Sequence, residues 1–364
     1  MVQHFQAAEQ NKTRVSAAPD AGGVLRAPLQ NESQLDSPIK LTVCLTERCN
    51  LNCAFCYADC NAPGKAPELS MATWHRVLHE SCDQGIIAFY FEGGEPFLRE
   101  GFEALIAGLA ERAFIMIRTN ATLIDRARAE RLAAIGVGEV FVDLWGASAA
   151  VHDAMTGSPG SHARTLAGID HLVAAGVAVK LLYVLTRVNV DETAAAAALA
   201  GERIPGAAIA FLRLYPLGRA RRDWERLSLP LEEQMAALEA AASEGGRVIH
   251  SWHPNNHNCC WQMAAIRADG ESIGCAYLRD YVAFGSITEK SLLETWAHPE
   301  HAALRSGAVE ASCADCAASQ GSHGGCRAAA YAFHGRFTAP DPYDSRLNQG
   351  LDLTRLPDAP PAAE

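Results

Sequence analysis

The run Arg48-Cys-Asn-Leu-Asn-Cys-Ala-Phe-Cys-Tyr57 decides how this chain is interpreted, because it places three cysteines in a C-x3-C-x2-C spacing. A structural zinc site takes four closed ligands and is usually built from paired C-x2-C units, so three grouped thiols fit it poorly. A [4Fe–4S] cube has four irons, and thiolates at Cys49, Cys53 and Cys56 leave one of them open to another ligand. The spacing therefore predicts an open iron–sulfur cluster, with zinc and plain electron transfer as the alternatives.

A second motif follows about one strand and one helix later. The apolar runs 39–45 and 86–91 each predict a buried strand, and the second leads into Phe91-Glu-Gly-Gly-Glu-Pro96. Paired glycines at a strand end let the backbone approach a ligand closely. Together, the two motifs resemble the radical SAM superfamily.

This resemblance implies a cofactor and a chemistry. The open iron would chelate S-adenosylmethionine (SAM), and Gly93, Gly94 and Glu95 would receive the amino group of SAM. Reductive cleavage of SAM would give a 5′-deoxyadenosyl radical that abstracts a hydrogen from the substrate, while the protein orients the substrate and excludes water.

Short apolar segments alternate with helical patterns after residue 38. Strands are predicted at 40–45, 86–91, 113–118, 139–144, 177–185 and 208–214, and helices near 70–82, 99–110, 124–134, 161–175 and 190–200. Gly136 and Gly176 stand where a helix ends before a strand, a position that favours glycine. Repeated βα units predict an α/β fold with a parallel sheet, which the pattern alone permits to be doubly wound. The resemblance selects a partial (β/α)6 TIM-like barrel with a small C-terminal Fe–S cluster domain, and with ligands at the C-terminal ends of the strands.

Changes in composition along the chain divide it into five segments, and the resemblance implies what the second and the fourth of them are. They are a disordered N-terminal tail (1–37), the radical SAM core (38–216), a helical linker (217–250), an auxiliary cluster domain (251–345) and a C-terminal tail (346–364).

The resemblance extends to further SAM-site residues. Tyr57 would lie near the adenine, Asn120 near the ribose and Leu185 at the border of the adenine, while Arg164 would pair with the SAM carboxylate. A buried core aromatic is the alternative for Tyr57, and a solvated helix residue is the alternative for Arg164.

Two positions depart from the family pattern. Ala121 replaces the glycine of a Thr-Asn-Gly motif, and Asp143 replaces a serine that lies near the methionyl end of SAM. A carboxylate there would be repelled by the SAM carboxylate, so we expect Asp143 to face a ribose hydroxyl, the methionyl amine or the substrate. Asp143 is accordingly the candidate catalytic base.

A second set of cysteines resembles the SPASM/twitch extension of radical SAM enzymes. Its members are Cys260 in the pattern C-x9-G-x4-C that ends at Cys275, then Cys313, Cys316 and Cys326. The resemblance implies one auxiliary [4Fe–4S] cluster held by Cys259 or Cys260, by Cys275, and by some of the last three.

The set is incomplete for two auxiliary clusters. Ser322 and Asp344 stand where the full pattern has cysteines, so a second cluster would need Ser322, His323 or Asp344 as ligands. A zinc ribbon is the alternative for this region.

Composition excludes several classes of partner. The net charge of −11 and the pI near 5.6 argue against binding to nucleic acid or to an anionic membrane. No apolar run is long enough to span a bilayer, and the N-terminus lacks the features of a signal peptide. Twelve cysteines at metal-binding spacings, without an export signal, predict a cytoplasmic protein.

The first expected function is oxidative maturation of a ribosomally made peptide. Tailoring of a small metabolite, sugar, nucleoside or tetrapyrrole is the alternative, and a non-catalytic Fe–S binding protein is the alternative of another class. Ala276 and Tyr277 stand where sulfatase-maturing relatives have an Asp base, which disfavours that reaction. Many peptide-maturing relatives carry a leader-peptide-binding module of about 80 residues before the barrel, whereas only about 37 residues precede the first strand here. A peptide substrate would therefore need a separate recognition protein or a short leader. A flavodoxin- or ferredoxin-type reductant would supply the electron.

Overall fold

Parallel strands form the centre of the molecule. The computed structural model describes residues 35–204, 206, 208–243, 247–252, 259–310, 324–348 and 350–357. The strands in these ranges are β1 (Lys40–Thr46), β2 (Ala88–Gly93), β3 (Phe114–Thr119), β4 (Glu139–Asp143), β5 (Val179–Val184), β6 (Ala208–Leu212), β7 (Arg247–His250) and β8 (Met263–Ile266). All eight pair in parallel in the order β7-β6-β5-β4-β3-β2-β1-β8.

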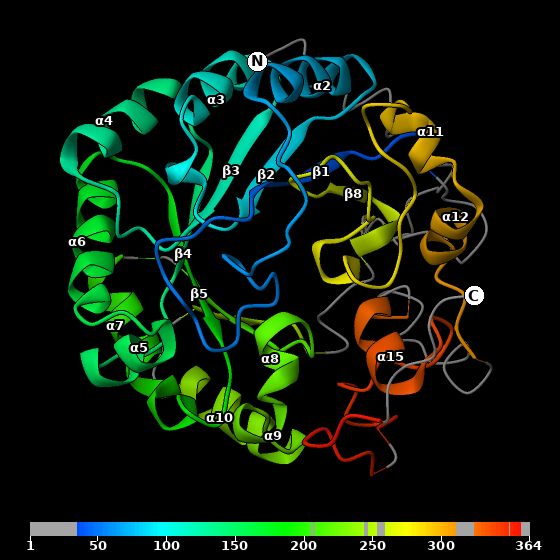
Figure 1. The fold of residues 1–364 in the computed structure, drawn as a ribbon. Coiled ribbons are helices and arrows are strands. Elements are labelled where there is room, and N and C mark those ends of the chain that lie inside the picture. The colour runs from blue at the N-terminus through cyan, green and yellow to red at the C-terminus, as the bar shows by residue number, and fades with distance from the viewer. Residues whose placement is uncertain are drawn as a thin grey trace, which may run out of the picture.

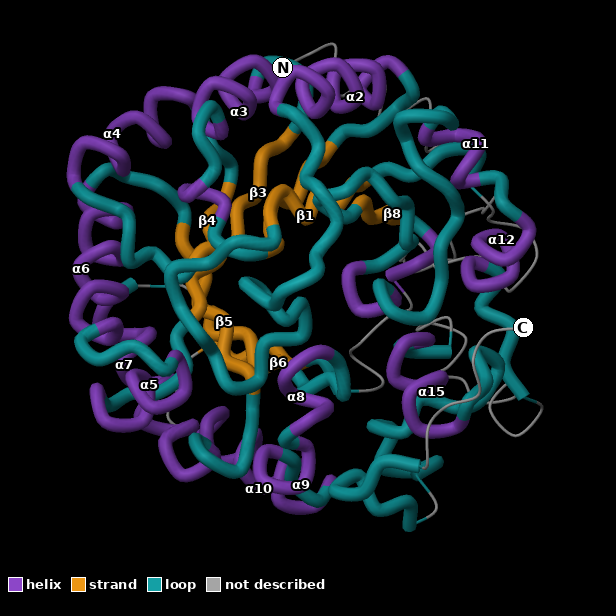
Figure 2. The backbone as a smooth tube through the Cα atoms, viewed as in Figure 1, coloured by secondary structure: helices purple, strands orange, loops and turns teal. Residues whose placement is uncertain are grey.

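Helices cover the outer side of this sheet, which curves around the centre of the molecule (Figure 1). They are α2 (Met71–Asp83), α3 (Phe102–Ala110), α4 (Arg126–Ile135), α5 (Ala149–Thr156), α6 (Ser161–Ala174), α7 (Thr193–Arg203) and α10 (Leu231–Ser243). The short helix α8 (Gly218–Arg222) lies instead in front of the strands, and α9 (Trp224–Leu227) follows it. The C-terminal helices α11 (Leu292–Trp296), α12 (Pro299–Arg305) and α15 (Arg327–His334) lie beyond β8. Figure 2 shows the strands as an inner wall surrounded by helices, as expected for a partial barrel.

Local signals in the sequence set the helix ends. The Oγ of Ser70 accepts a hydrogen bond from the backbone N–H of Thr73 at 3.0 Å and begins α2. Gly136 and Gly176 follow α4 and α6 with φ of 82° and 77°, in the left-handed region where glycine is favoured. The two predicted helix-ending glycines are therefore confirmed.

Alternate residues of the central strands face opposite sides of the sheet. Phe89, Phe91, Ile115, Ile117, Val140 and Val142 are all fully or almost fully buried. The Phe91 ring packs edge-on against Phe102 of α3, with ring centroids 5.3 Å apart. The residues between them, among them Glu92, Arg118 and Asp143, line internal cavities instead. The two-residue period of a strand thus separates the core from the site.

The six predicted strands and five predicted helices are present within a few residues of the expected ranges. Two strands and four α-helices of the described residues were not predicted, namely β7, β8, α5, α11, α12 and α15. The segment 217–250, expected to be a helical linker, holds α8, α9 and α10 but ends in β7, which pairs with β6. A strand of four residues is too short for its apolar pattern to stand out in the sequence.

No helix among the described residues is long and apolar enough to cross a membrane.

Candidate active site

A cavity of about 760 Å³ lies at the C-terminal ends of the strands. It brings together nine of the residues predicted from the sequence, namely Cys49, Cys53, Cys56, Tyr57, Gly93, Gly94, Glu95, Asn120 and Asp143. These residues come from the loops after β1, β2 and β3 and from the end of β4. We call this space the first cavity, and we call residues 47–61 the cluster loop.

Hydrogen-bond donors lie next to two of the three thiols of the cluster loop, Cys49 and Cys56. The Cys49 sulfur accepts from the Leu51 N–H at 3.4 Å and lies 3.9 Å from the Asn120 Nδ2. Burial raises the pKa of Cys49 to about 12. A hydrogen bond with the Cys60 thiol lowers the pKa of Cys56 to about 6, so Cys60 acts as the donor of that pair.

The three thiols of the cluster loop all line the first cavity. Within the described ranges, no three His, Cys, Asp or Glu side chains could hold one metal ion together. Three thiolates are the protein ligands that a [4Fe–4S] cluster with one open iron takes, so Cys49, Cys53 and Cys56 would hold such a cluster. When bound, a cluster with chelated SAM supplies the electron that cleaves SAM.

The Gly-Gly-Glu segment packs against the start of the cluster loop. The N–H of Gly94 donates to the Thr46 carbonyl at 2.6 Å, and the N–H of Glu95 donates to the Arg48 carbonyl at 2.8 Å. A Cβ on Gly94 would lie 1.9 Å from the Arg48 oxygen, and one on Gly93 would lie 2.6 Å from the Thr46 oxygen. Both positions thus require glycine, because the backbone at the end of β1 fills the space beside Gly93 and the backbone of Arg48 in the cluster loop fills the space beside Gly94.

Glu95 connects the ends of β2 and β3 from a buried position. Its Oε1 accepts from the Thr119 hydroxyl at 2.8 Å, and its Oε2 accepts from the Asn120 N–H at 3.0 Å. Burial raises the pKa of Glu95 to about 7. Ala121 has a φ of 57° and is fully buried, which explains why the family prefers glycine there.

An ion cluster forms one wall of the first cavity. The Arg118 Nε donates to the Asp143 Oδ1 at 2.9 Å, and the Arg118 Nη1 lies 3.5 Å from the Glu92 Oε2. Burial raises the pKa of Asp143 to about 6 despite the adjacent guanidinium. Arg118 and Glu92 were not predicted, although a charged residue inside an apolar strand is the signal that could have found them.

A second cavity of about 1200 Å³ lies between the sheet and the C-terminal region. Cys260, Cys275 and Cys326 all line it, so the structure brings together the predicted auxiliary ligands that it describes. Cys313 and Cys316 lie outside the described residues, as do Ser322 and His323. Both carboxylate oxygens of Asp344 accept from Arg346.

The two cavities share a wall made of Glu92, Arg118, Tyr215 and Tyr277. The rings of Tyr215 and Tyr277 stack with centroids 3.9 Å apart, and Tyr277 lies 5.0 Å from Tyr57. The Tyr215 hydroxyl lies 3.4 Å from the Cys326 sulfur. Contacting aromatic side chains therefore run from the cluster loop to a predicted auxiliary ligand.

Two predicted residues lie outside the first cavity. Arg164 is exposed on α6, where it donates to the Ser158 hydroxyl at 3.2 Å. Leu185 is buried, and its neighbour Val184 lines the cavity instead. Their predicted roles at the SAM carboxylate and the adenine are therefore not supported by their positions.

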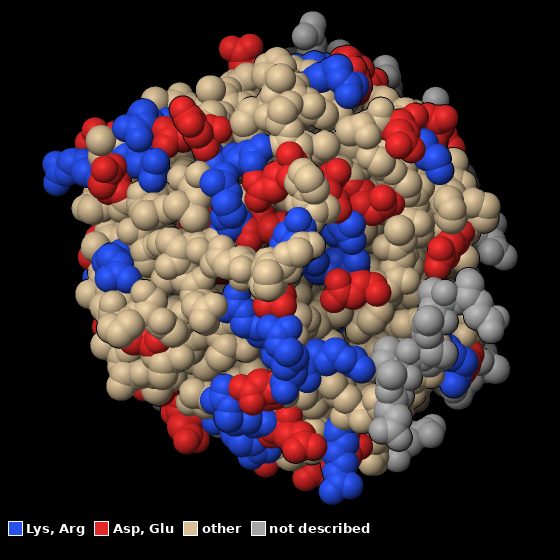
Figure 3. Space-filling model, viewed as in Figure 1, with Lys and Arg blue, Asp and Glu red and all other residues tan. Residues whose placement is uncertain are grey.

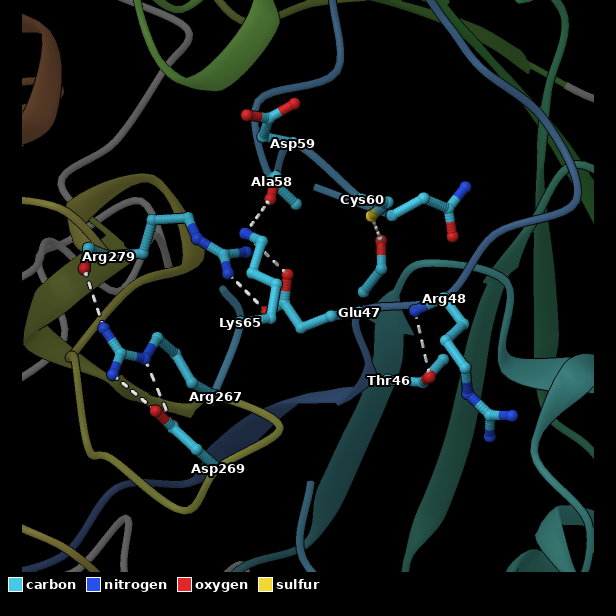
Figure 4. A network of polar contacts seen from close by, with 12 residues as sticks. Thr46, Glu47, Arg48, Ala58, Asp59, Cys60, Lys65, Arg267, Asp269 and Arg279 are labelled. Atoms are coloured by element: carbon cyan, nitrogen blue, oxygen red, sulfur yellow. Dashed lines mark hydrogen bonds and ion pairs between the residues drawn. The ribbon is translucent and has the colours of Figure 1, made fainter. Parts of the chain in front are cut away.

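The cluster loop is tied to the C-terminal region by buried charges. Figure 4 shows Arg279 reaching toward Glu47, with which it forms an ion pair. The Lys65 Nζ lies 3.1 Å from the other Glu47 oxygen and also donates to the Ala58 carbonyl at 2.7 Å. Glu47 and Arg279 stand two and four residues from Cys49 and Cys275, so this pair joins the two predicted cluster-binding segments.

Comparisons with known proteins agree with this geometry. The family model of the radical SAM superfamily matches residues 43–200, and that of the SPASM iron–sulfur cluster-binding domain matches residues 259–317. Mycofactocin maturase MftC of Mycobacterium ulcerans is 30% identical over 335 residues, which are 86% of this chain and 89% of that protein. PqqA peptide cyclase of Gluconobacter oxydans is 28% identical over 348 residues, which are 88% of this chain and 96% of that protein.

A solved structure shares the fold. SuiB of Streptococcus suis bound to S-adenosylmethionine aligns with a TM-score of 0.66 at 16% identity, covering 89% of this chain and 77% of SuiB. One conclusion follows from the first cavity and its Gly-Gly-Glu segment, together with the two family matches and the relative at 30% identity. The chain belongs to the radical SAM superfamily and is a radical SAM enzyme with a SPASM iron–sulfur domain.

Proposed function

We propose that this enzyme uses SAM cleavage to modify a peptide substrate oxidatively. The named activities of the relatives favour this class, since they include a peptide cyclase and a maturase. The observation that carries the proposal is the shared wall between the first cavity and the second cavity. Cys260, Cys275 and Cys326 on the far side of this wall would hold an auxiliary cluster, which would supply an acceptor for one electron from a substrate radical. Asp143 would accept the proton that is lost with this electron, so that the substrate is oxidised by two hydrogen atoms in total.

The residues of the shared wall, and Asp143 beside it in the first cavity, have separate roles in this proposal. Arg118 holds the Asp143 carboxylate at 2.9 Å and fixes its direction. With its pKa raised to about 6, Asp143 is mostly ionised at neutral pH and is basic enough to accept a substrate proton. Tyr215 and Tyr277 limit the space that the substrate can occupy and exclude water from the reacting carbon.

The cofactors divide between the two cavities. Cys49, Cys53 and Cys56 hold the SAM cluster, and Tyr57, Gly93, Gly94, Glu95 and Asn120 border SAM. Cys260, Cys275 and Cys326 hold an auxiliary cluster, with Cys313 and Cys316 as further candidates.

We propose that the chain is organised as a core at 38–216, a linker at 217–250 and an auxiliary domain at 251–345.

The proposed reaction also has cellular requirements. A flavodoxin- or ferredoxin-type reductant supplies the electron, a separate protein presents the peptide, and the reducing cytoplasm keeps the thiols free.

Co-expression with short peptides encoded beside the gene tests the proposal. Mass spectrometry should find one peptide lighter by a pair of hydrogen atoms when the enzyme is intact. Cys275→Ala should still form 5′-deoxyadenosine but should not convert the peptide. If no encoded peptide changes mass while a small metabolite does, the peptide proposal is wrong.

A further inference from the structure

The chain segment that follows β6 contacts the cluster loop directly. Gly218 and Arg219 begin α8, and their partners in the loop lie between 159 and 167 residues earlier in the sequence. Figure 1 places α8 in front of the inner wall of strands, and Figure 3 shows Lys and Arg side chains mixed with Asp and Glu side chains across this face. The sequence patterns had assigned this segment only to a linker.

Arg219 uses its backbone and its whole guanidinium to hold the loop. Its N–H donates to the Cys56 carbonyl at 2.9 Å, and its Nη2 donates to the Cys60 carbonyl. Its Nη1 donates to the Cys53 carbonyl at 3.0 Å and to the Asn52 Oδ1 at 2.5 Å. Its Nε donates to the Asp59 Oδ1 at 3.1 Å. One side chain therefore satisfies carbonyls at both ends of residues 53–60.

Gly218 makes this approach possible. Its φ is 52°, in the region that favours glycine. A Cβ at this position would lie 2.5 Å from the Cys56 oxygen and 2.6 Å from the Tyr57 oxygen. The backbone of α8 thus lies against the backbone of the loop, with no room for a side chain.

We propose that Gly218 and Arg219 form a clamp that holds Cys53 and Cys56 in the conformation that binds the SAM cluster. Ordering a loop of this length costs conformational entropy. Because the clamp orders the loop before the cluster binds, this entropy cost does not have to be met during cluster binding. The planar guanidinium can hold several carbonyls at fixed angles, which the single ammonium of lysine cannot do. Arg219 is therefore a positioning residue, and this role does not depend on the identity of the substrate.

Arg222 provides a matched control. It lies on the same helix and donates to both Asp59 oxygens at 2.8 and 2.9 Å, but its side chain is 62% exposed. In the described part of the chain, its side-chain hydrogen bonds all go to Asp59. Arg222→Ala therefore removes a neighbouring positive charge without removing a bond to a loop carbonyl.

The first readout uses the cluster-free protein. Hydrogen exchange of the amides in residues 52–60 should become about tenfold faster or more in Arg219→Ala, because several charge-assisted hydrogen bonds are lost. It should change much less in Arg222→Ala, which loses only an exposed pair with the Asp59 side chain. Equal exchange in wild type and Arg219→Ala, or equal acceleration in both variants, would overturn the proposal.

The second readout uses the anaerobically reconstituted protein. In Arg219→Ala, a chelator should remove iron about tenfold faster, and the EPR change that SAM causes in the reduced cluster should be altered. Arg219→Lys should fall between wild type and Arg219→Ala, and it carries the test if Arg219→Ala does not fold. A wild-type EPR response to SAM in Arg219→Lys together with wild-type iron retention would contradict the clamp. No peptide is needed, so this result is independent of the proposed function.

Discussion

Single residues in the first cavity are constrained by the backbone around them. Gly93 and Gly94 are enclosed by the carbonyls of Thr46 and Arg48, and Ala121 adopts a φ of 57° where the family has glycine. The Gly-Gly-Glu motif therefore also reflects close packing between the ends of β1 and β2. Its two glycines leave space for the carbonyls of Thr46 and Arg48, in addition to their predicted role in binding SAM.

Gly94→Ala should disrupt the site, because its Cβ would overlap the Arg48 oxygen at 1.9 Å. We expect a loss of about 1–3 kcal/mol of unfolding free energy, measured by urea denaturation of the cluster-free protein. Gly201→Ala in α7 is the control, since no atom lies within 4 Å of its new Cβ. Equal stability of the two variants would show that the overlap is relieved at no cost.

Asp143 should make stability depend on pH. Burial raises its pKa from 3.8 to about 6 in the folded protein, so the folded state binds the proton more tightly than the unfolded state does. The contribution of protonated Asp143 to the free energy of unfolding is therefore fully present below about pH 4 and is lost as the pH rises to about 6. The stability difference between wild type and Asp143→Asn should fall over this window, by at most about 1.4 kcal/mol per pH unit. If this stability difference stays constant or rises with pH, the pKa of Asp143 is not raised by burial in the folded protein.

The sequence predicts the cysteines and the Gly-Gly-Glu residues of the first cavity because each group is local along the chain. Arg118, Glu92, Tyr215 and Tyr277 could not be predicted in the same way. Their contacts depend on the register of neighbouring strands and on how the C-terminal region folds back. Arg164 is an example of the opposite error. Its position near the start of a helix made it a candidate partner of the SAM carboxylate, but in the structure it lies outside the first cavity and donates to Ser158.

At the scale of elements, long strands were predictable and short ones were not. β1 to β6 follow apolar runs of five or more residues, whereas β7 and β8 have four residues each and extend the two ends of the sheet. β8 lies beside β1, so the C-terminal region contributes a strand next to the cluster loop. The sheet therefore joins the segments that the sequence assigned to separate domains.

The Glu47–Arg279 pair should contribute to this junction. Arg279→Ala leaves Glu47 buried with only Lys65, so we expect a loss of about 2–4 kcal/mol of unfolding free energy. Arg76→Ala is the control, because its pair with Glu80 is exposed and should cost about 0.5 kcal/mol or less. Chemical denaturation of both variants measures the difference, and similar losses would mean that the buried pair has no special role.

At the scale of the whole molecule, two cavities lie on either side of one wall. The first holds the predicted SAM-cluster thiols, and the second holds three predicted auxiliary thiols. Tyrosine rings connect them through contacts of 5.0 and 3.9 Å. The central claim is that each cavity binds its own cluster, so that radical formation and oxidation take place side by side.

Iron and sulfide analysis with EPR tests this claim most directly, on anaerobically reconstituted wild type beside a variant with Cys49, Cys53 and Cys56 all changed to alanine. We predict about eight irons in wild type and about four in the variant, with the SAM-dependent EPR change lost. About four irons in wild type and none in the variant would contradict the account, because the second cavity would then hold no cluster.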